Sequence, residues 1–572
     1  MADEKNNKDS EGIEPVSGRK IIKDPVHGYI DIPTKYCQLF VDTPIFQRLR
    51  QIEQTSMRWL FPSARHDRFM HSLGVFHLAS RIYDSILENV QDKEVKSELE
   101  RTDSDSKEPN LKSTFLVASL MHDCGHAPFS HTFEKFYNRD ADGSSHNEAF
   151  KKLKEIVPRE DADDFDFTSA IGKKPPAHHE AMSAYVLLSN YSEEMGKTHV
   201  DSGLAARMIT GVLYRPATVP NPTGGNGQRQ DDGGKKELGF REKVANALIT
   251  LLNSDALDID KLDYTLRDTW ASGVKNTAID MDRLIRGATI VRSKADGQDS
   301  VRFAFQKSAI SVVQSVIDAR NYLYNWVYGH HTALYYSHLL EQAVVKFAEK
   351  FAKSHQASEN SVQAPDNSVL RRMFSPEIFC KEVDPSKQDD LRIYLLSDAD
   401  ILHFLKQVVP DEPDCVAYFS HKPRHISLWK TGADYRKLID ASIRFSLISD
   451  ACVEKIREKF DLSPDECFAC NDMTKKIYDL KDEDVQIEVD KGMIVPITEL
   501  VSLPKHPRLA EENDAPVFYI YLDEKKKACK EDIIKFINEF PAKKHACCQC
   551  PYVPKEKRCI SRQNRPCSML KE

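Results

Sequence analysis

The sequence has no long apolar run and no apolar leader at its start. A membrane-spanning helix needs roughly 20 consecutive apolar residues, and stretches such as FLVASLM (115–121) are much shorter. The chain begins with MADEKNNKDSEG, which is polar and acidic, whereas a secretory signal has a basic start followed by an apolar core. These absences predict a cytoplasmic protein that binds no membrane.

The chain also lacks an excess of positive charge and a paired set of cysteines. Its 572 residues include 80 Lys and Arg against 88 Asp and Glu, a formal net charge of −8. Nucleic acid is therefore not an expected partner, and any phosphate-binding site must be local. The 13 cysteines are an odd number spread over a long chain, which favours reduced thiols or a metal site over a disulfide framework.

Composition divides the chain into four segments. Residues 1–18 show no apolar period and are expected to be a disordered tail. Helical patterns separated by polar loops predict a helical bundle over residues 19–351. Shorter strand-like and helical pieces over residues 352–541 predict a smaller C-terminal α+β region for regulation or oligomerisation, followed by a Cys-rich tail at 542–572. The predicted fold class is therefore mainly α.

Local signals place several elements. Thr43-Pro44 is an N-cap followed by proline at the first helical position, which predicts a helix that begins with PIFQRLR. Apolar residues recur at helical spacing on most sides of the segment 69–86, so a helix there should lie deep in the bundle. Farther along, ACVEKIREKF (451–460) is typical of a helix, and three pieces are typical of strands: CVAYFSH (415–421), HISLW (425–429) and VFYIYL (517–522).

The densest cluster of reactive side chains is LMHDCGHAPFSH, which follows an apolar helical run. His122 and His126 are four residues apart and would share a helix face, whereas the adjacent His122 and Asp123 can reach one ion only where the helix ends. Gly125 and Pro128 are expected to supply that ending. Imidazole nitrogen with carboxylate oxygen suits Fe, Zn, Mn or Co, and Mg where oxygen dominates. The alternative is a hydrogen-bonded His-Asp pair in the core.

Two further segments favour a metal site. RHDRFMHSLG (65–74) places His71 near the start of the most apolar helix, and NSDALDIDKLDYTLRD (253–268) places Asp260 on a third helix. A buried histidine or carboxylate is costly unless it is paired or bound to metal. Side chains from three helices could therefore meet at one ion.

In their order and spacing, HDRFMHSLG, MHDCGHAPFSH and DIDKLDYTLRD resemble the HD-domain phosphohydrolases, specifically the deoxynucleoside triphosphate triphosphohydrolase family with vertebrate and bacterial members. The similarity spans roughly residues 19–350, and no SAM domain is expected before it. The resemblance implies one divalent metal held by His71, His122, Asp123 and Asp260. It also implies hydrolysis of dNTPs to deoxynucleosides and inorganic triphosphate, for dNTP-pool control or antiviral (antiphage) depletion of dNTPs.

The resemblance implies roles for the residues around the metal as well. Hydrolysis of a phosphate ester needs positive charge, a positioned water and an acid for the leaving group. His126 is the preferred proton donor, and hydrogen bonding to the metal ligands is an alternative role for His131 and His179. The implied catalytic residues are His126, His131, Glu134 and His179. The implied substrate-binding residues are Gln54, Arg68, Lys261, Tyr264, Asp268, Arg320 and Tyr328.

Some positions depart from the family pattern and leave alternatives open. Glu134 stands where the vertebrate enzyme has aspartate, Gly329 replaces a glutamine after the sugar-gating Tyr328, and Thr55 replaces a leucine beside the sugar. An HD phosphohydrolase that acts on a ribonucleotide or a nucleotide signal is one alternative. A non-catalytic regulator that senses nucleotides or binds nucleic acid is another, but the complete ligand set argues against it.

The resemblance also implies regulation by nucleotides. Lys20, Asp42, Gln47 and Arg50 match positions that form a guanine-nucleotide activator pocket at a subunit interface, in which Asp42 would accept from guanine and the basic residues would hold phosphates. It predicts nucleotide-dependent activation or assembly of a homo-oligomer, from dimer to tetramer or larger. Asp42 could instead assist the start of the following helix.

The C-terminal tail suggests a second metal. Cys547, Cys550, Cys559 and Cys567 have a local spacing that can close a tetrahedral zinc site, and a short polar tail otherwise has little to fold around. The alternative is a flexible Cys-rich tail. A second C-x2-C pair, Cys467 and Cys470, could instead supply two of the ligands.

Overall fold

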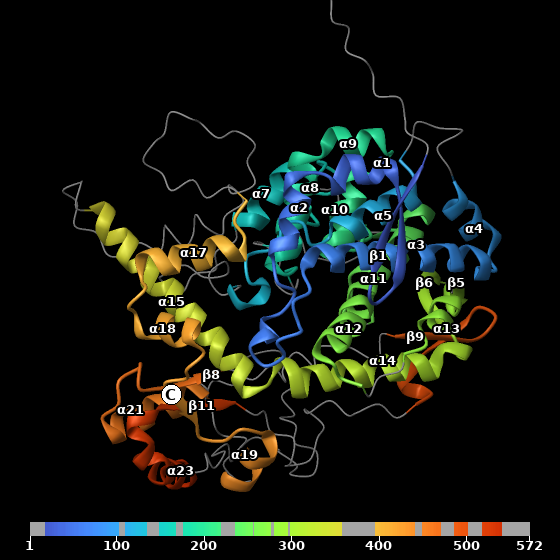
Figure 1. Cartoon of the computed structure of the whole chain (residues 1–572). Helices are drawn as coiled ribbons and strands as arrows, with labels where there is room; N and C mark the ends of the chain where they lie inside the picture. Colours follow the sequence, from blue (N-terminus) through green and yellow to red (C-terminus); the bar gives the residue numbers. More distant parts are fainter. Residues whose placement is uncertain are drawn as a thin grey trace, which may run out of the picture.

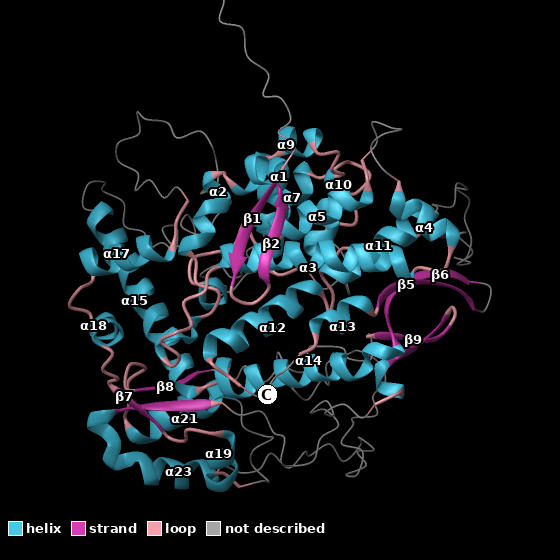
Figure 2. Cartoon of the chain, turned by 45° about the vertical axis from the view of Figure 1, so that its right-hand side comes forward, coloured by secondary structure: helices cyan, strands magenta, loops and turns pink. Residues whose placement is uncertain are grey.

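The computed structural model of the chain is mainly helical, with short strands at its periphery (Figures 1 and 2), which confirms the predicted fold class. Nothing is described for the predicted tail residues 1–17 and 542–572. The structure describes residues 18–101, 109–133, 148–167, 175–218, 235–255, 257–275, 279–295, 298–356, 395–440, 449–470, 485–501 and 518–539.

The first part of the chain forms a bundle of helices (Figure 1). An antiparallel hairpin of β1 (Arg19–Asp24) and β2 (Gly28–Pro33) leads into it. The helices are α1 (Thr34–Tyr36), α2 (Pro44–Arg48), α3 (Arg68–Asn89), α4 (Lys93–Glu100), α5 (Leu111–Met121), α7 (Glu148–Ile156), α8 (His178–Asn190), α9 (Ser192–Lys197), α10 (Ser202–Thr210), α11 (Phe240–Leu252), α12 (Ile259–Ser272), α13 (Met281–Arg286), α14 (Ile310–Leu323) and α15 (His331–Gln356).

The two helix predictions in the bundle are confirmed. Thr43 caps α2 by accepting a hydrogen bond from the Phe46 amide, and Pro44 is its first residue. Helix α3 is buried along most of its length and packs against α5 and α12. Burying apolar surface on nearly all sides of one helix makes α3 the centre of the core, from which its first turn can carry a protected polar site.

A second group of elements forms the smaller module at the lower left of Figure 1. Its antiparallel sheet has the order β7–β11–β8, and its core includes one face of α15. The elements are α17 (Asp398–Val408), α18 (Pro413–Ser420), β7 (His425–Ser427), α19 (Gly432–Leu438), α21 (Ser449–Phe460), β8 (Cys467–Cys470), β11 (Tyr519–Asp523) and α23 (Lys530–Asn538).

The strand prediction for CVAYFSH is wrong, whereas those for HISLW and VFYIYL and the helix prediction for ACVEKIREKF are confirmed. CVAYFSH lies in α18, where Pro413 stands at the start of the helix and Cys415 and Tyr418, three residues apart, are buried on one face. A short apolar run fits a strand or a helix equally well, and proline at the first helical position favours the helix.

Packing crosses the predicted boundary at residue 351 in both directions. Strands β5 (Ala288–Ala295) and β6 (Gln298–Gln306) join β9 (Gln486–Asp490) and β10 (Met493–Pro496) in a mixed sheet of order β10–β9–β6–β5, at the right of Figure 2. Conversely, α15 packs in the C-terminal core. The division into 19–351 and 352–541 therefore stays a prediction about folding units. A further two-stranded ladder pairs β3 (Ala217–Thr218) with β4 (Lys235–Lys236).

Two expectations about the chain's chemistry can be compared with the described residues. None of the described helices is long and apolar enough to cross a membrane. The described cysteines are all free thiols, in keeping with the prediction of reduced cysteines.

We expect the free energy of unfolding to fall as the pH is lowered from about 6.5 towards 4. His77 on α3 is largely buried, and burial, aided by the charges of His27 and Arg81, lowers its pKa from 6.5 to about 4. His77 takes up a proton at a higher pH in the unfolded chain than in the folded chain. Its contribution to the free energy of unfolding is therefore fully present above pH 6.5 and is lost as the pH falls towards 4. Urea unfolding at several pH values should show a shallower pH slope for His77→Gln but not for the exposed control His403→Gln. Parallel curves for all three proteins would contradict this.

Candidate active site

Four side chains from three helices converge beside the start of α3. His71 lies in its first turn, His122 and Asp123 follow the end of α5 at Met121, and Asp260 lies in the first turn of α12. His71 Nε2 is 2.9 Å from Asp260 Oδ1, 3.3 Å from His122 Nε2 and 3.6 Å from Asp123 Oδ2. The structure therefore brings together all four predicted metal ligands.

Both histidines turn Nε2 towards this group, because Nδ1 is bonded elsewhere. His71 donates through Nδ1 to Asp263 Oδ2 (2.7 Å), and His122 donates through Nδ1 to the Ser119 carbonyl (2.9 Å). A bound metal would take the place of a proton on each Nε2. Ligands about 2.1 Å from one ion lie roughly 3.0–3.4 Å apart in octahedral or tetrahedral geometry. The residues present therefore fit a divalent metal.

The electrostatics of the group also favour a cation. Burial opposes ionisation of Asp123, yet Arg68, which donates to its Oδ2 at 2.6 Å, and His122 hold its pKa well below the ordinary value. Burial likewise lowers the pKa of His71, but its hydrogen bonds with Asp260 and Asp263 outweigh burial and raise that pKa to about 9. The carboxylates thus stabilise positive charge at this point.

Asp263 is a supporting residue that the sequence analysis did not identify. Its carboxylate is fully buried and accepts from His71, from His27 Nε2 (2.6 Å) and from Arg267 Nε (2.8 Å). Arg267 also donates to Asp24 (2.8 Å). A carboxylate that fixes a ligating imidazole is common at metal sites, and the spacing of Asp263 three residues after Asp260 was a signal for it.

We expect Asp263→Asn to weaken metal binding by about 10- to 100-fold, the usual effect of losing a residue that orients a metal ligand. The amide cannot accept from His71, His27 and Arg267 together, so the His71 ring loses its fixed orientation. Equilibrium dialysis against each candidate metal would measure the change, with the exposed Asp282→Asn as the control. Equal affinity in both variants would show that Asp263 has no such role.

A second cluster contains the predicted catalytic histidines. The rings of His126 and His179 stack at 4.5 Å, and His131 lies edge-on to both at 5.2 Å. His126 is completely buried, and within the described ranges neither of its ring nitrogens has a hydrogen-bond partner. Burial, together with Arg68 and His179, holds its pKa well below the ordinary value. Glu134, the fourth predicted catalytic residue, lies outside the described residues.

The shared helix face predicted for His122 and His126 is wrong. Helix α5 ends at Met121, and the His126 amide donates to the Asp123 carbonyl in a turn. Because the chain turns here, His122 and Asp123 can reach one ion while His126 joins His131 and His179. The end of the helix was predicted from Gly125 and Pro128, but it comes earlier than either.

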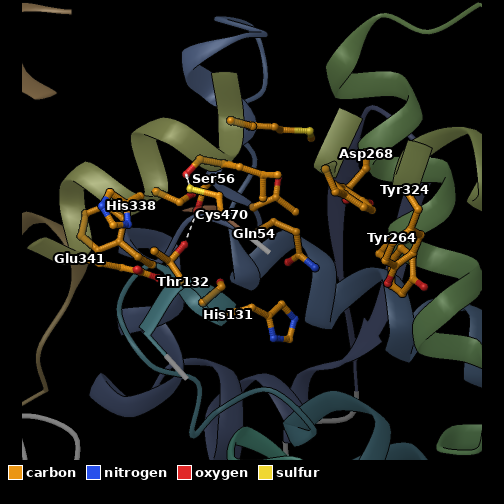
Figure 3. Close-up of a pocket in the computed structure, with 18 of the residues that line it drawn as sticks. Gln54, Ser56, His131, Thr132, Tyr264, Asp268, Tyr324, His338, Glu341 and Cys470 are labelled. Atoms are coloured by element: carbon orange, nitrogen blue, oxygen red, sulfur yellow. Dashed lines mark hydrogen bonds between the residues drawn. The ribbon is translucent and has the colours of Figure 1, made fainter. Parts of the chain in front are cut away.

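A pocket of about 510 Å³ opens beside these clusters (Figure 3). Arg68 in its wall donates to Asp123, one of the four predicted metal ligands (the metal group), and His131 in its wall packs against His126 in the histidine cluster. Five of the predicted substrate residues line it: Gln54, Arg68, Tyr264, Asp268 and Tyr328.

The remaining two predicted substrate residues lie behind this wall. Arg320 donates to the Tyr264 hydroxyl (3.0 Å) and lies over the Tyr324 ring, and Lys261 donates to Asp258 (2.5 Å). Tyr328 donates to Asp268, which also accepts from His66. The Gln54 Oε1 and Thr55 Oγ1 atoms are buried and have no hydrogen-bond partner among the described residues, so a ligand could bond to them only after these side chains turn towards the pocket.

The opposite wall comes from elements that the sequence analysis did not connect with the site. In Figure 3, His338 and Glu341 of α15 and Cys470 of β8 lie across the pocket from Tyr264, Tyr324 and Asp268. No local motif connects these residues with the site, and Cys470 was noted only as part of a C-x2-C pair. Only the packing of the C-terminal module against α15 brings them to the pocket.

The predicted activator residues lie together on the surface. Lys20 pairs with Asp42 at 3.4 Å, and both side chains are about half exposed. Gln47 donates to the Val41 carbonyl and accepts from Arg50. The four residues therefore form two hydrogen-bonded pairs near α2, in which Lys20, Asp42 and Arg50 are exposed and Gln47 is partly exposed.

The predicted zinc ligands Cys547, Cys550, Cys559 and Cys567 lie outside the described residues. Cys467 and Cys470 are buried in β8, and the metal-competent groups found among the described residues contain neither of them.

Comparison with known proteins finds similarity to HD-domain proteins. Residues 68–210 match the HD domain family model, a segment that contains His71, His122 and Asp123 but not Asp260. The chain is 28% identical over 360 residues to the deoxynucleoside triphosphate triphosphohydrolase SAMHD1 homolog of Dictyostelium discoideum. These aligned residues cover 62% of this chain and 54% of that protein.

Two further similarities agree with this. The SAMHD1 enzyme of Danio rerio is 26% identical over 338 residues, which cover 57% of this chain and 45% of that protein. The chain thus spans about half the length of these curated relatives. A solved phosphohydrolase from Bacteroides thetaiotaomicron shares the fold, with a TM-score of 0.54 and 21% identity over 88% of this chain and 100% of that chain.

Proposed function

We propose, from the premise that this chain belongs to the HD-domain dNTPase-like family, that it hydrolyses dNTPs to deoxynucleosides and inorganic triphosphate. The observation that carries the proposal is the convergence of His71, His122, Asp123 and Asp260 beside a pocket large enough for a nucleotide. Arg68 connects the two features, because it contacts Asp123 and lines the pocket.

The four ligands would hold one divalent ion, for which Fe, Mn, Zn, Co and Mg are the candidates. Such an ion supplies positive charge that stabilises the reacting phosphate and acidifies a water molecule. Arg68 would neutralise the phosphate oxygens around the α-phosphorus, where water attacks, and Tyr264 would donate a hydrogen bond to them. Lys261 and Arg320 would add positive charge from outside the pocket lining. Triphosphate then leaves as one piece while the nucleoside oxygen receives a proton, for which His126 is the proposed donor.

The sugar would lie against Tyr328. The hydrogen bond from its hydroxyl to Asp268 fixes the ring at the pocket wall, so a ribose 2′-hydroxyl would meet an aromatic surface instead of a polar partner. Gln54 also lines the pocket, and a turn of its amide would let it bond to the sugar 3′-hydroxyl. These contacts support deoxyribose as the preferred sugar.

A second candidate function rests on Thr55. Thr55 lines the pocket where the family pattern has an apolar leucine. Its hydroxyl is buried without a hydrogen-bond partner among the described residues, and a turn of the side chain would let it bind the 2′-oxygen of a ribonucleotide. Gly329, which follows Tyr328, replaces the glutamine of the family pattern and leaves the choice of base open. Thr55 therefore favours the alternative function, an HD phosphohydrolase that acts on ribonucleotides or nucleotide signals.

Product analysis separates these functions. The full chain, loaded with each candidate metal, is incubated with each dNTP and NTP, singly and in pairs, and the products are separated by chromatography. Inorganic triphosphate from dNTPs is the expected product. Orthophosphate or pyrophosphate would contradict the cleavage position, faster turnover of NTPs would favour the alternative, and no turnover under any condition would favour a nucleotide-sensing regulator.

We also propose that a nucleotide bound at Lys20, Asp42, Gln47 and Arg50 promotes activation or assembly of a homo-oligomer. The exposure of three of these residues supports a binding surface, and the carboxylate and basic groups match the donors of guanine and the charge of phosphate. An unchanged mass of the assembly and an unchanged rate of hydrolysis with every nucleotide would overturn this proposal.

In the cell, the proposed hydrolysis of dNTPs would serve dNTP-pool control or antiphage depletion of dNTPs.

A further inference from the structure

Two loops that line the pocket depend on contacts with the C-terminal module. Residues 53–59 provide Gln54, Thr55 and Ser56, and residues 126–133 provide Ser130 and His131. In the second loop, Phe129 (φ 55°) and Ser130 (φ 50°) both have left-handed backbone conformations. Such conformations are unfavourable for side chains with a Cβ and persist only where the surroundings hold them.

Asp398, the first residue of α17, bonds to both loops. Its Oδ1 accepts from the Phe129 amide at 2.6 Å, and its Oδ2 accepts from the Glu53 amide at 2.8 Å. The side chain is buried with 6% of the residue exposed. One carboxylate from the C-terminal module therefore fixes the backbone of two pocket loops at Glu53 and Phe129, which are 76 residues apart in the chain.

Neighbouring contacts reinforce this connection. Arg48 donates from Nη2 to the His126 carbonyl (2.8 Å) and from Nε to the Leu396 carbonyl (2.5 Å), which ties the start of the second loop to the segment before α17. At the other end of the first loop, Trp59 packs edge-on against Tyr418 at 4.5 Å and stacks on His421 at 5.3 Å. The first loop is thus held by the module at both ends.

The loops in turn contact the metal group. Ser130 Oγ donates to the Glu53 carbonyl (2.5 Å) and accepts from Arg68 Nε (3.0 Å), and Arg68 Nη1 donates to Asp123 Oδ2 (2.6 Å). A continuous set of hydrogen bonds therefore runs from the loops beside Asp398 to a predicted metal ligand. A shift of either loop would displace Arg68 as well as the pocket wall.

We propose that Asp398 is a positioning residue through which the C-terminal module holds the two pocket loops in their reactive arrangement. Its effect on hydrolysis rests on the proposed function, but its hold on the loops does not. Asp398→Asn keeps the size of the side chain and loses one acceptor, because an amide nitrogen cannot accept from a backbone N–H. The exposed Asp411→Asn, in the same module, is the matched control.

Hydrogen exchange with single-residue resolution tests the hold on the loops. In the wild-type chain, the Glu53 and Phe129 amides should exchange more slowly than the solvent-exposed amides of their loops. In Asp398→Asn, exchange over residues 53–59 and 126–133 should rise about tenfold or more, with no change in Asp411→Asn. Two results would overturn the proposal. One is fast exchange of the Glu53 and Phe129 amides in the wild-type chain, which can be measured even if the variant fails to fold. The other is unchanged exchange in a folded Asp398→Asn.

Hydrolysis and metal content test the positioning role. We expect kcat to fall at least about tenfold in Asp398→Asn with metal content unchanged, because the four ligands stay in place while Arg68 and His131 lose their alignment. Faster loop exchange with an unchanged kcat would overturn the positioning role. If the wild-type chain hydrolyses no nucleotide, the proposed function fails and the exchange result alone decides whether Asp398 holds the loops.

Discussion

Asp260→Ala is expected to abolish bound metal and nucleotide hydrolysis together. Asp260 Oδ1 lies 2.9 Å from His71 Nε2 and 3.9 Å from His122 Nε2, and Asp260 is the one proposed ligand contributed by α12. Its loss leaves two imidazoles and one carboxylate that already accepts from Arg68. Because a metal supplies several kcal/mol of transition-state stabilisation, the rate should fall roughly 10³-fold or more.

Metal analysis and turnover of the same preparation would check this result. The Asp260 side chain is 37% exposed, so its truncation leaves no buried cavity and the thermal midpoint should change little. Asp318→Ala removes an exposed carboxylate from α14 and serves as the control. A variant of Asp260 that keeps its full metal content but loses activity would show that Asp260 acts on substrate and is not a ligand.

Local sequence patterns were sufficient to predict the helices and the helix end that carry the site, because these features depend on residues close together in the chain. The apolar period of α3 and the cap at Thr43-Pro44 act within a few residues, so the helices they predict are present. His122 and Asp123 are adjacent, and the helix must end beside them for both to reach one ion, as it does at Met121. His71 and Asp260 were indicated by their places on two other helices, and the family resemblance then assigned all four residues to one ligand set.

The supporting contacts could not be predicted because their partners are distant in the chain. Asp263 accepts from His71 and His27, which precede it by 192 and 236 residues. Asp398 follows Phe129 by 269 residues. No helical or strand period relates residues at such separations, and a buried aspartate resembles an exposed one in a single sequence. The same reason applies to the α15 and β8 wall of the pocket.

His126→Ala should reduce the rate by about 10²- to 10⁴-fold while metal content stays at the wild-type level, the usual contribution of general acid-base catalysis. His126 is not one of the four proposed ligands, and its ring nitrogens have no hydrogen-bond partner among the residues that the structure describes. Burial and the charge of Arg68 keep its pKa well below the ordinary value, so the imidazole is neutral before the substrate enters. A bound polyphosphate would add negative charge nearby and raise that pKa, which prepares His126 to donate.

The competing donor is His131, which lines the pocket whereas His126 lies beneath it. Comparison of His126→Ala, His131→Ala and the exposed control His403→Ala, each measured for kcat, KM and metal content, distinguishes the two. If His126 is the donor, His126→Ala should lower kcat more than the other two variants and should remove one pH-dependent limb of the rate profile. His126→Asn should not restore that limb, because an amide does not titrate. A larger kcat loss and an altered profile in His131→Ala alone would assign proton donation to His131 and leave His126 as a packing partner of His179.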